Sequence, residues 1–158
     1  MKIENLLVGC LIFAFGFISC LFLFYMRNVE LPFGFLSNDS TPSPGDWVSE
    51  KQIKIYDDKI VIELSNPSLS RYAPSGSMRP VLNSKANGIR IKPKSPEQIN
   101  VGDIVSFRRG MDLVVHRVIK KGEDSEGVYF ITKGDNNDFV DGKIRFKDIK
   151  YVTVGVIW

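Results

Sequence analysis

The apolar residues of this chain are concentrated in one long run near its start. Leu6 to Met26 holds no charged residue, and 18 of its 21 residues are apolar. At about 1.5 Å per residue, a helix of this length measures roughly 31 Å, which is enough to cross the hydrocarbon core of a bilayer. A cleaved signal would end at small residues, whereas this run ends at Phe24-Tyr25-Met26-Arg27. We therefore predict a retained transmembrane helix over residues 6–26, behind a short flank of residues 1–5.

Behind the apolar run the pattern changes twice. Residues 27–47 are rich in Pro, Gly and Ser and follow neither a helical nor a strand period, so we expect a tether. After the tether, β-branched and aromatic segments alternate with turn residues. The predicted strands are Ile53–Leu64, Ile89–Lys92, Asp103–Phe107, Leu113–Lys120, Val128–Thr132 and Tyr151–Ile157. No segment there keeps a 3.6-residue period for three turns. We predict a mainly β domain over residues 48–158, either a small antiparallel β-barrel or a folded sheet.

Charge and cysteine content exclude several classes of function. The balance of 21 Lys and Arg against 18 Asp and Glu gives a net charge of +3, and no dense basic run suggests nucleic acid binding. Cys10 and Cys20 both lie inside the apolar run, so the predicted domain can form no disulfide. With a single histidine in the chain we expect no zinc site, and no cofactor motif is present. Charges flanking the apolar run do not indicate its orientation.

Two segments could carry chemistry. His116 is the only histidine and, by strand alternation, shares a face with Val114 and Val118. This pattern fits a buried structural histidine as well as a catalytic one. The second segment is the turn Ser75-Gly76-Ser77, bracketed by Pro74 and Pro80, from which a hydroxyl can project. It could equally be a plain surface turn. Because the predicted domain has no cysteine, a nucleophile paired with His116 must be Ser or Thr.

A polar loop follows the predicted strand Val128–Thr132. It contains three carboxylates, Asp135, Asp138 and Asp141. An EF-hand reading fails, because the spaced Gly and the distal Glu are missing. If the strands on either side of residues 123–127 form a hairpin, this loop emerges beside His116. An aspartate from the loop could then reach the imidazole.

Four blocks together resemble the type I signal peptidases. They are Ser75-Gly76-Ser77-Met78-x-Pro80, Gly102-Asp103-Ile104-Val105, His116-Arg117-Val118-Ile119, and Lys133-Gly134-Asp135-Asn136-Asn137 followed by Asp141. Their order and spacing agree with that family over about residues 65–158. The bacterial branch of the family uses Ser and Lys, whereas the archaeal and endoplasmic-reticulum branch has His where His116 stands. The chain is therefore similar to the second branch.

The resemblance implies a role for each matching residue. Ser77 would be the nucleophile, His116 its general base, Asp141 the carboxylate that orients the base, and Asp135 a supporting acid. The oxyanion would be held by the Ser77 N–H and the Ser75 hydroxyl. The peptide would bind along Arg71, Tyr72, Ala73, Pro74 and Ser75. No metal or cofactor is implied.

The resemblance also implies substrate, partners and location. The substrates would be signal peptides of exported preproteins. The protein would be single-pass in the cell membrane, with its catalytic domain extracytoplasmic and the export machinery as a further partner. Two features depart from the family. Arg79 stands where relatives often have Glu or Asp, and the chain stops at Trp158 without a second apolar run.

Two alternatives compete with this reading. The first is a Ser/Lys protease related to the self-cleaving repressors, with Lys120 or Lys121 as base. These lysines are neighbours at the predicted turn, and the repressors carry no membrane anchor. The second is a catalytically inactive, membrane-tethered β-module that binds export partners. The presence of Ser77, His116 and two downstream acids argues against it.

Overall fold

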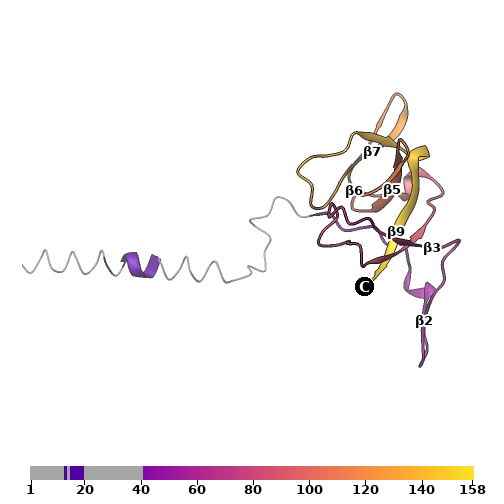
Figure 1. Ribbon diagram of the computed structural model, residues 1–158, viewed down its shortest axis with the longest axis horizontal. Coiled ribbons are helices and arrows are strands. Elements are labelled where there is room, and N and C mark those ends of the chain that lie inside the picture. Colours follow the sequence, from indigo (N-terminus) through magenta and orange to yellow (C-terminus); the bar gives the residue numbers. More distant parts are fainter. Residues whose placement is uncertain (1–12, 14, 20–40) are drawn as a thin grey trace, which may run out of the picture. The chain divides into compact units, whose positions relative to one another are not determined.

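The computed structural model describes residues 13, 15–19 and 41–158, which belong to two units divided after Ser40. In the first unit, Phe13 and residues 15–19 are helical (Figure 1). The rest of the predicted transmembrane segment 6–26 and residues 27–40 of the predicted tether lie outside the described residues. Among the residues that are described, no helix combines the length and the apolar character needed to cross a membrane. The transmembrane helix and the domain boundaries therefore stay predictions.

The second unit, residues 41–158, is built from strands and short 3₁₀ turns. The strands are β1 (Ile53–Ile55), β2 (Ile60–Ile62), β3 (Ser68–Arg71), β4 (Asn87–Ile91), β5 (Ile104–Arg109), β6 (Asp112–Asp124), β7 (Gly127–Lys133), β8 (Lys143–Arg145) and β9 (Ile149–Ile157). The 3₁₀ turns are η1 (Glu50–Gln52), η2 (Pro96–Gln98) and η3 (Phe146–Asp148). No α-helix occurs within residues 41–158. The prediction of a mainly β domain is confirmed.

Seven strands form one antiparallel sheet in the order β3-β4-β9-β5-β6-β7-β8. Strand β3 lies at one end of this order and β8 at the other, and these two do not pair with each other. The sheet is open, so of the two predicted forms the folded sheet is present and the closed barrel is not. The open edge at β3 matters for the site, because an edge strand presents unpaired backbone groups.

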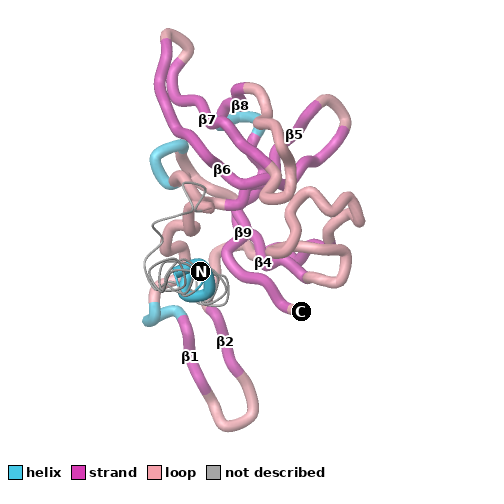
Figure 2. Tube along the Cα trace, turned by 90° about the vertical axis from the view of Figure 1, so that its left-hand side faces the viewer, coloured by secondary structure: helices cyan, strands magenta, loops and turns pink. Residues whose placement is uncertain are grey.

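The predicted strand Ile53–Leu64 is wrong as a single element. The chain turns at Asp57-Asp58 and forms a separate hairpin of β1 and β2, which extends from the rest of the unit (Figure 2). The turn is closed by the Tyr56 N–H, which donates to the Lys59 carbonyl over 2.9 Å. Two adjacent acids are poor strand residues, and this explains why the β-branched run is interrupted there. The short strands β3 and β8 were not predicted.

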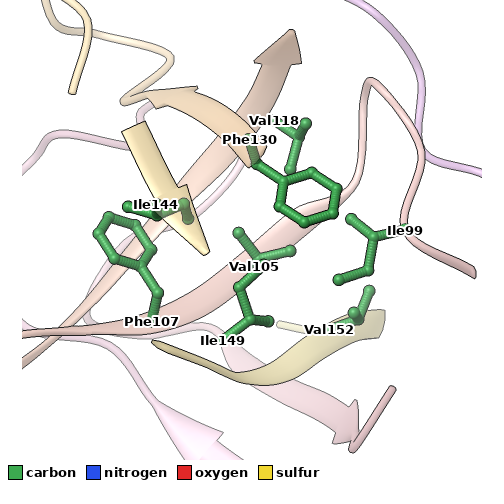
Figure 3. Packing of buried hydrophobic residues seen from close by; sticks show 8 residues of the cluster. All are labelled: Ile99, Val105, Phe107, Val118, Phe130, Ile144, Ile149 and Val152. Carbon is green, nitrogen blue, oxygen red and sulfur yellow. The ribbon is translucent and has the colours of Figure 1, made fainter. Parts of the chain in front are cut away.

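The main core packs against one face of the sheet. Its buried residues are Ile99, Val105, Phe107, Val118, Phe130, Ile144, Ile149 and Val152 (Figure 3). Burial of each of these side chains contributes roughly 1.5–3 kcal/mol. A smaller cluster of Met78, Leu82 and Ile104, joined by Tyr72, Val115 and Val156, lies apart from it. Because successive strand residues point to opposite faces, Val105 joins the main core while Ile104 joins the smaller one.

The strand register places the histidine as predicted. His116 lies opposite Val105 in the β5–β6 ladder, and Val118 and Val114 belong to or pack against the main core. His116 therefore shares the face of Val114 and Val118. Its ring centroid is 6.3 Å from that of Phe107.

Candidate active site

The serine turn lies between β3 and β4 and is fixed by one buried side chain. Gly76 has φ +76°, in the left-handed region that glycine favours. The turn continues in hydrogen bonds from the Arg79 N–H to the Gly76 carbonyl and from the Leu82 N–H to the Met78 carbonyl. Met78 is only 5% exposed and packs into the smaller cluster, whereas Ser77 is half-buried and Ser75 is exposed. Burial of Met78 thus holds the neighbouring serine at the surface of a cavity.

The loop after β7 holds this turn through hydrogen bonds to its backbone carbonyls. The Asn136 N–H donates to the Ser77 carbonyl over 2.8 Å, and the Asn136 side chain donates to the Gly76 carbonyl over 3.2 Å. A Cβ on Gly134 would lie 2.7 Å from the Ser77 carbonyl oxygen, which is closer than real Cβ contacts. Gly134 and Asn136 together therefore set the position of Ser77.

Asp135 is held by Arg117 rather than by the histidine. The Arg117 guanidinium donates from Nε and Nη2 to the two carboxylate oxygens, each over 2.8 Å. Its Nη1 donates to the carbonyls of Gly102 and Pro42 over 2.8 and 3.2 Å. Both side chains are buried, and loss of one partner of such a pair costs about 3–5 kcal/mol. Asp135 thus ties the loop to β6, so its support of the site is indirect.

Asp141 is the carboxylate that contacts His116. Its Oδ2 lies 2.6 Å from His116 Nδ1 and accepts a hydrogen bond from the Thr132 hydroxyl over 2.7 Å. Its Oδ1 accepts from Arg109 Nη2. Its own N–H donates to the Thr132 carbonyl over 2.7 Å. His116 is 6% exposed, so the ring is clamped in one orientation.

The environment keeps Asp141 ionised. Burial alone would raise the pKa of this carboxyl, but hydrogen bonds from His116, Thr132 and Arg109 outweigh burial and lower it. An ionised carboxylate only accepts hydrogen bonds, so His116 Nδ1 must carry a proton. Nε2 is then the free acceptor of the neutral ring.

This lowered pKa predicts an acid-labile site. A carboxyl with a depressed folded-state pKa stabilises the fold above its unfolded pKa, near 3.9, and loses that contribution as the pH falls through the folded value. Urea unfolding from about pH 7 down to about pH 2.5 should show that Asp141→Asn flattens the acid limb of stability. Asp138→Asn, a change of an exposed acid in the same loop, should leave the limb unchanged. Parallel curves for the wild type and Asp141→Asn would contradict the assignment.

Ser77 and His116 line the same cavity of about 610 Å³. Of the residues expected to bind peptide, Arg71, Tyr72, Ala73 and Ser75 also line it, and Pro74 does not. Ser77 Oγ lies 3.2 Å from Ser75 Oγ, and among the described residues it makes no hydrogen bond to His116. Catalytic hydrogen bonds are often long in the absence of substrate and tighten when substrate binds.

Two residues that contact Asp141, Thr132 and Arg109, were not predicted from the sequence. Thr132 has a signal that could have been used, since it directly precedes the acidic loop and lies opposite Val118 in the β6–β7 ladder. Arg109 has no such signal in the sequence, because its contact with Asp141 depends on how the loop after β7 returns to the sheet.

The lysines of the Ser/Lys alternative lie elsewhere. Lys120 is exposed, and Lys121 Nζ donates to the carbonyls of Glu97 and Ile99 over 3.2 and 2.9 Å. Neither lysine lines the cavity that holds Ser77. The described geometry therefore gives no support to Lys120 or Lys121 as base.

Comparison with known proteins also points to the signal peptidases. The chain is similar to the "Signal peptidase complex catalytic subunit SEC11C" of Canis lupus familiaris, Homo sapiens and Mus musculus, with 39% identity over 77 residues in each case. The aligned part is 47% of this chain and 39% of the relative, so the chain spans well under half the length of the curated relatives it matches. No protein-family model and no solved structure matches the chain. Over these 77 residues, the comparison confirms the resemblance to the endoplasmic-reticulum type of signal peptidase.

Proposed function

We propose that this protein is a membrane-bound serine endopeptidase that removes N-terminal signal peptides from exported preproteins. The observation that carries the proposal is the clamped histidine: Asp141 fixes the ring through Nδ1, and the ring lines the same cavity as Ser77. A Ser/His hydrolase needs a histidine base that a carboxylate orients, and Asp141 orients His116 in this way. The similarity to signal peptidase catalytic subunits supports the reaction type.

In this mechanism Ser77 Oγ attacks the scissile carbonyl while His116 Nε2 accepts its proton. The imidazolium, stabilised by Asp141, then returns the proton to the leaving amine. The Ser77 N–H donates to Ser75 Oγ over a long 3.4 Å, so this hydrogen bond is weak and the N–H is available to a developing oxyanion. The Ser75 hydroxyl is the second candidate donor.

Peptide binding uses the open edge of the sheet. Among the strands of residues 41–158, β3 pairs only with β4, so an extended peptide can add to its free side and run towards Ser77 along Arg71–Ser75. Met78, Leu82 and Val115 provide an apolar wall of the cavity for the small side chains that precede a signal-peptide cut.

The direct test is cleavage of a preprotein by the purified protein in detergent. We expect one cut after a small residue, identified by sequencing the new amino terminus. Cleavage should disappear with Ser77→Ala. Cleavage by the wild type and by this variant at equal rates would show a contaminating protease. The absence of any cut in several preproteins would favour an inactive binding module.

Membrane attachment by residues 6–26 is part of the proposal, with the catalytic domain on the extracytoplasmic side and the export machinery as a partner. Signal peptides are cut where they emerge from the bilayer, so the cavity must face that side. Protease added to intact cells should remove a tag placed after Trp158. A tag that is protected until the cells are lysed would place the domain in the cytoplasm, and the proposed function would have to be abandoned.

The support of the serine turn can be tested at Gly134. Gly134→Ala should push the Ser77 carbonyl away by a few tenths of an ångström or more, because the added Cβ would lie 2.7 Å from it. A small misplacement of a catalytic group costs up to about 10²-fold in rate, so kcat should fall by about that factor. Gly142→Ala is the matched control, since a Cβ there meets nothing within 4 Å. Full kcat in Gly134→Ala would show that the loop does not position the nucleophile.

A further inference from the structure

A buried arginine lines the cavity that holds Ser77 and His116. Arg90, on β4, lies opposite Ser68 of β3 and Thr153 of β9, and it is only 8% exposed. Arginine is rarely buried to this extent without an anionic partner, because the desolvation of a cation is costly.

The guanidinium of Arg90 has few partners. Its Nη2 donates to Ser68 Oγ over 3.1 Å, and its Nε has no hydrogen-bond partner among the described residues. Within residues 41–158, no carboxylate lies at ion-pair distance from it. The positive charge of Arg90 is thus left uncompensated inside the cavity wall.

Two neighbouring rings do not supply the missing charge. The guanidinium carbon of Arg90 lies 4.2 Å from the centroid of the Tyr151 ring, a cation–π contact in which the ring carries no net negative charge. The pKa of Tyr72 is raised, because the effect of burial outweighs the hydrogen bond with Thr153 and the charge of Arg90, which both lower it. Tyr72 therefore stays a neutral phenol.

The cavity as a whole carries an excess of positive charge. Three arginines line it, Arg71, Arg90 and Arg109, against one acid, Asp112. Of these, Arg109 is paired with Asp141. A cleft lined by one sign of charge concentrates ligands of the other sign.

We propose that the cavity binds a carboxylate side chain, Glu or Asp, of the substrate peptide, and that Arg90 is the residue that selects it. This inference rests on the proposed peptidase function and narrows its substrate class to peptides with an acid near the cut. The bound carboxylate would supply the anionic partner that the described residues do not give Arg90. Charge-assisted hydrogen bonds to a buried guanidinium are the strong kind, so selection should be large.

The test uses matched peptides with blocked ends, identical except for one residue. Glu is placed in turn at each position on both sides of the cut and compared with Gln, which has the same shape without the charge. At one position the wild type should prefer Glu by about tenfold to hundredfold in kcat/KM. In Arg90→Met this ratio should fall to about one, and Arg90→Lys should keep part of it. Arg108→Gln, which removes an exposed arginine that does not line the cavity, should keep the full ratio.

Equal rates for Glu and Gln at every position of the wild type would overturn the proposal without any variant being needed. Thermal unfolding checks that Arg90→Met is folded. A Glu preference that persists unchanged in this folded variant would come from another residue and would also overturn the proposal. The dissociation constants of the same peptide pairs for Ser77→Ala decide the proposal separately from catalysis. A complex that is tenfold tighter with the Glu peptide than with the Gln peptide would support selection by Arg90, even if no peptide were cut. Absence of cleavage would count only against the proposed peptidase function.

Discussion

Ser77→Ala should lower preprotein cleavage by about four to six powers of ten, to the level left by binding and the oxyanion donors alone. The reason is that the proposed chemistry begins with attack by the Ser77 oxygen, which this variant lacks. Ser75 Oγ, 3.2 Å away, belongs to the preceding arm of the turn. Single-turnover cleavage of a labelled preprotein measures the loss. The fold should be intact, because Ser77 is only half-buried and its backbone contacts do not involve the side chain oxygen.

Two further serine changes separate the roles within the turn. Ser75→Ala removes one candidate oxyanion donor, so the expected loss is only about 10²-fold to 10³-fold, mainly in kcat. Ser125→Ala changes an exposed serine in the β6–β7 turn and should have no effect. If Ser75→Ala were the inactive variant and Ser77→Ala the mild one, the nucleophile would have to be reassigned to Ser75.

The fold was largely predictable because strands and turns alternate clearly in residues 48–158. Val105 and His116 lie opposite each other in a ladder between two predicted strands. The two strands that were not predicted, β3 and β8, have local features that explain this. Strand β8 has only three residues, too few for a period-two pattern to stand out. Strand β3, Ser68-Leu69-Ser70-Arg71, is mostly polar, because it is an edge strand with one free side.

The site was predictable in its residue types but not in its contacts. The spacing indicated that an aspartate of the loop could reach His116, and Asp141 does so. The pairing of Asp135 with Arg117 depends on alternation along β6, which turns Arg117 to the face opposite His116. Arg109 reaches Asp141 across a sequence separation of 32 residues, a contact that no local pattern encodes. Long-range contacts of this kind arise only when the loop closes over the sheet.

Asp141→Asn should lower kcat by about 10⁴-fold while the protein stays folded at neutral pH. The carboxylate only accepts hydrogen bonds, so it holds the proton of His116 on Nδ1 and leaves Nε2 free to act as base. An asparagine side chain can present its NH₂ group to Nδ1 instead. That would place the proton on Nε2, so Nε2 could no longer accept the proton of Ser77. It would also remove the charge that stabilises the imidazolium.

Because His116 is the only histidine, its tautomer can be read without resonance assignment, from the ¹⁵N chemical shifts of the ring. The wild type should show the proton on Nδ1, and Asp141→Asn should show a shift of the proton to Nε2 together with the loss of kcat. Asp138→Asn, in the same loop but exposed, should change neither. Asp135→Asn disturbs the ion pair with Arg117, so it should lower activity through the position of Ser77 and leave the tautomer as in the wild type. An unchanged tautomer in a fully active Asp141→Asn would show that His116 needs no carboxylate, and catalysis would then be a Ser/His dyad.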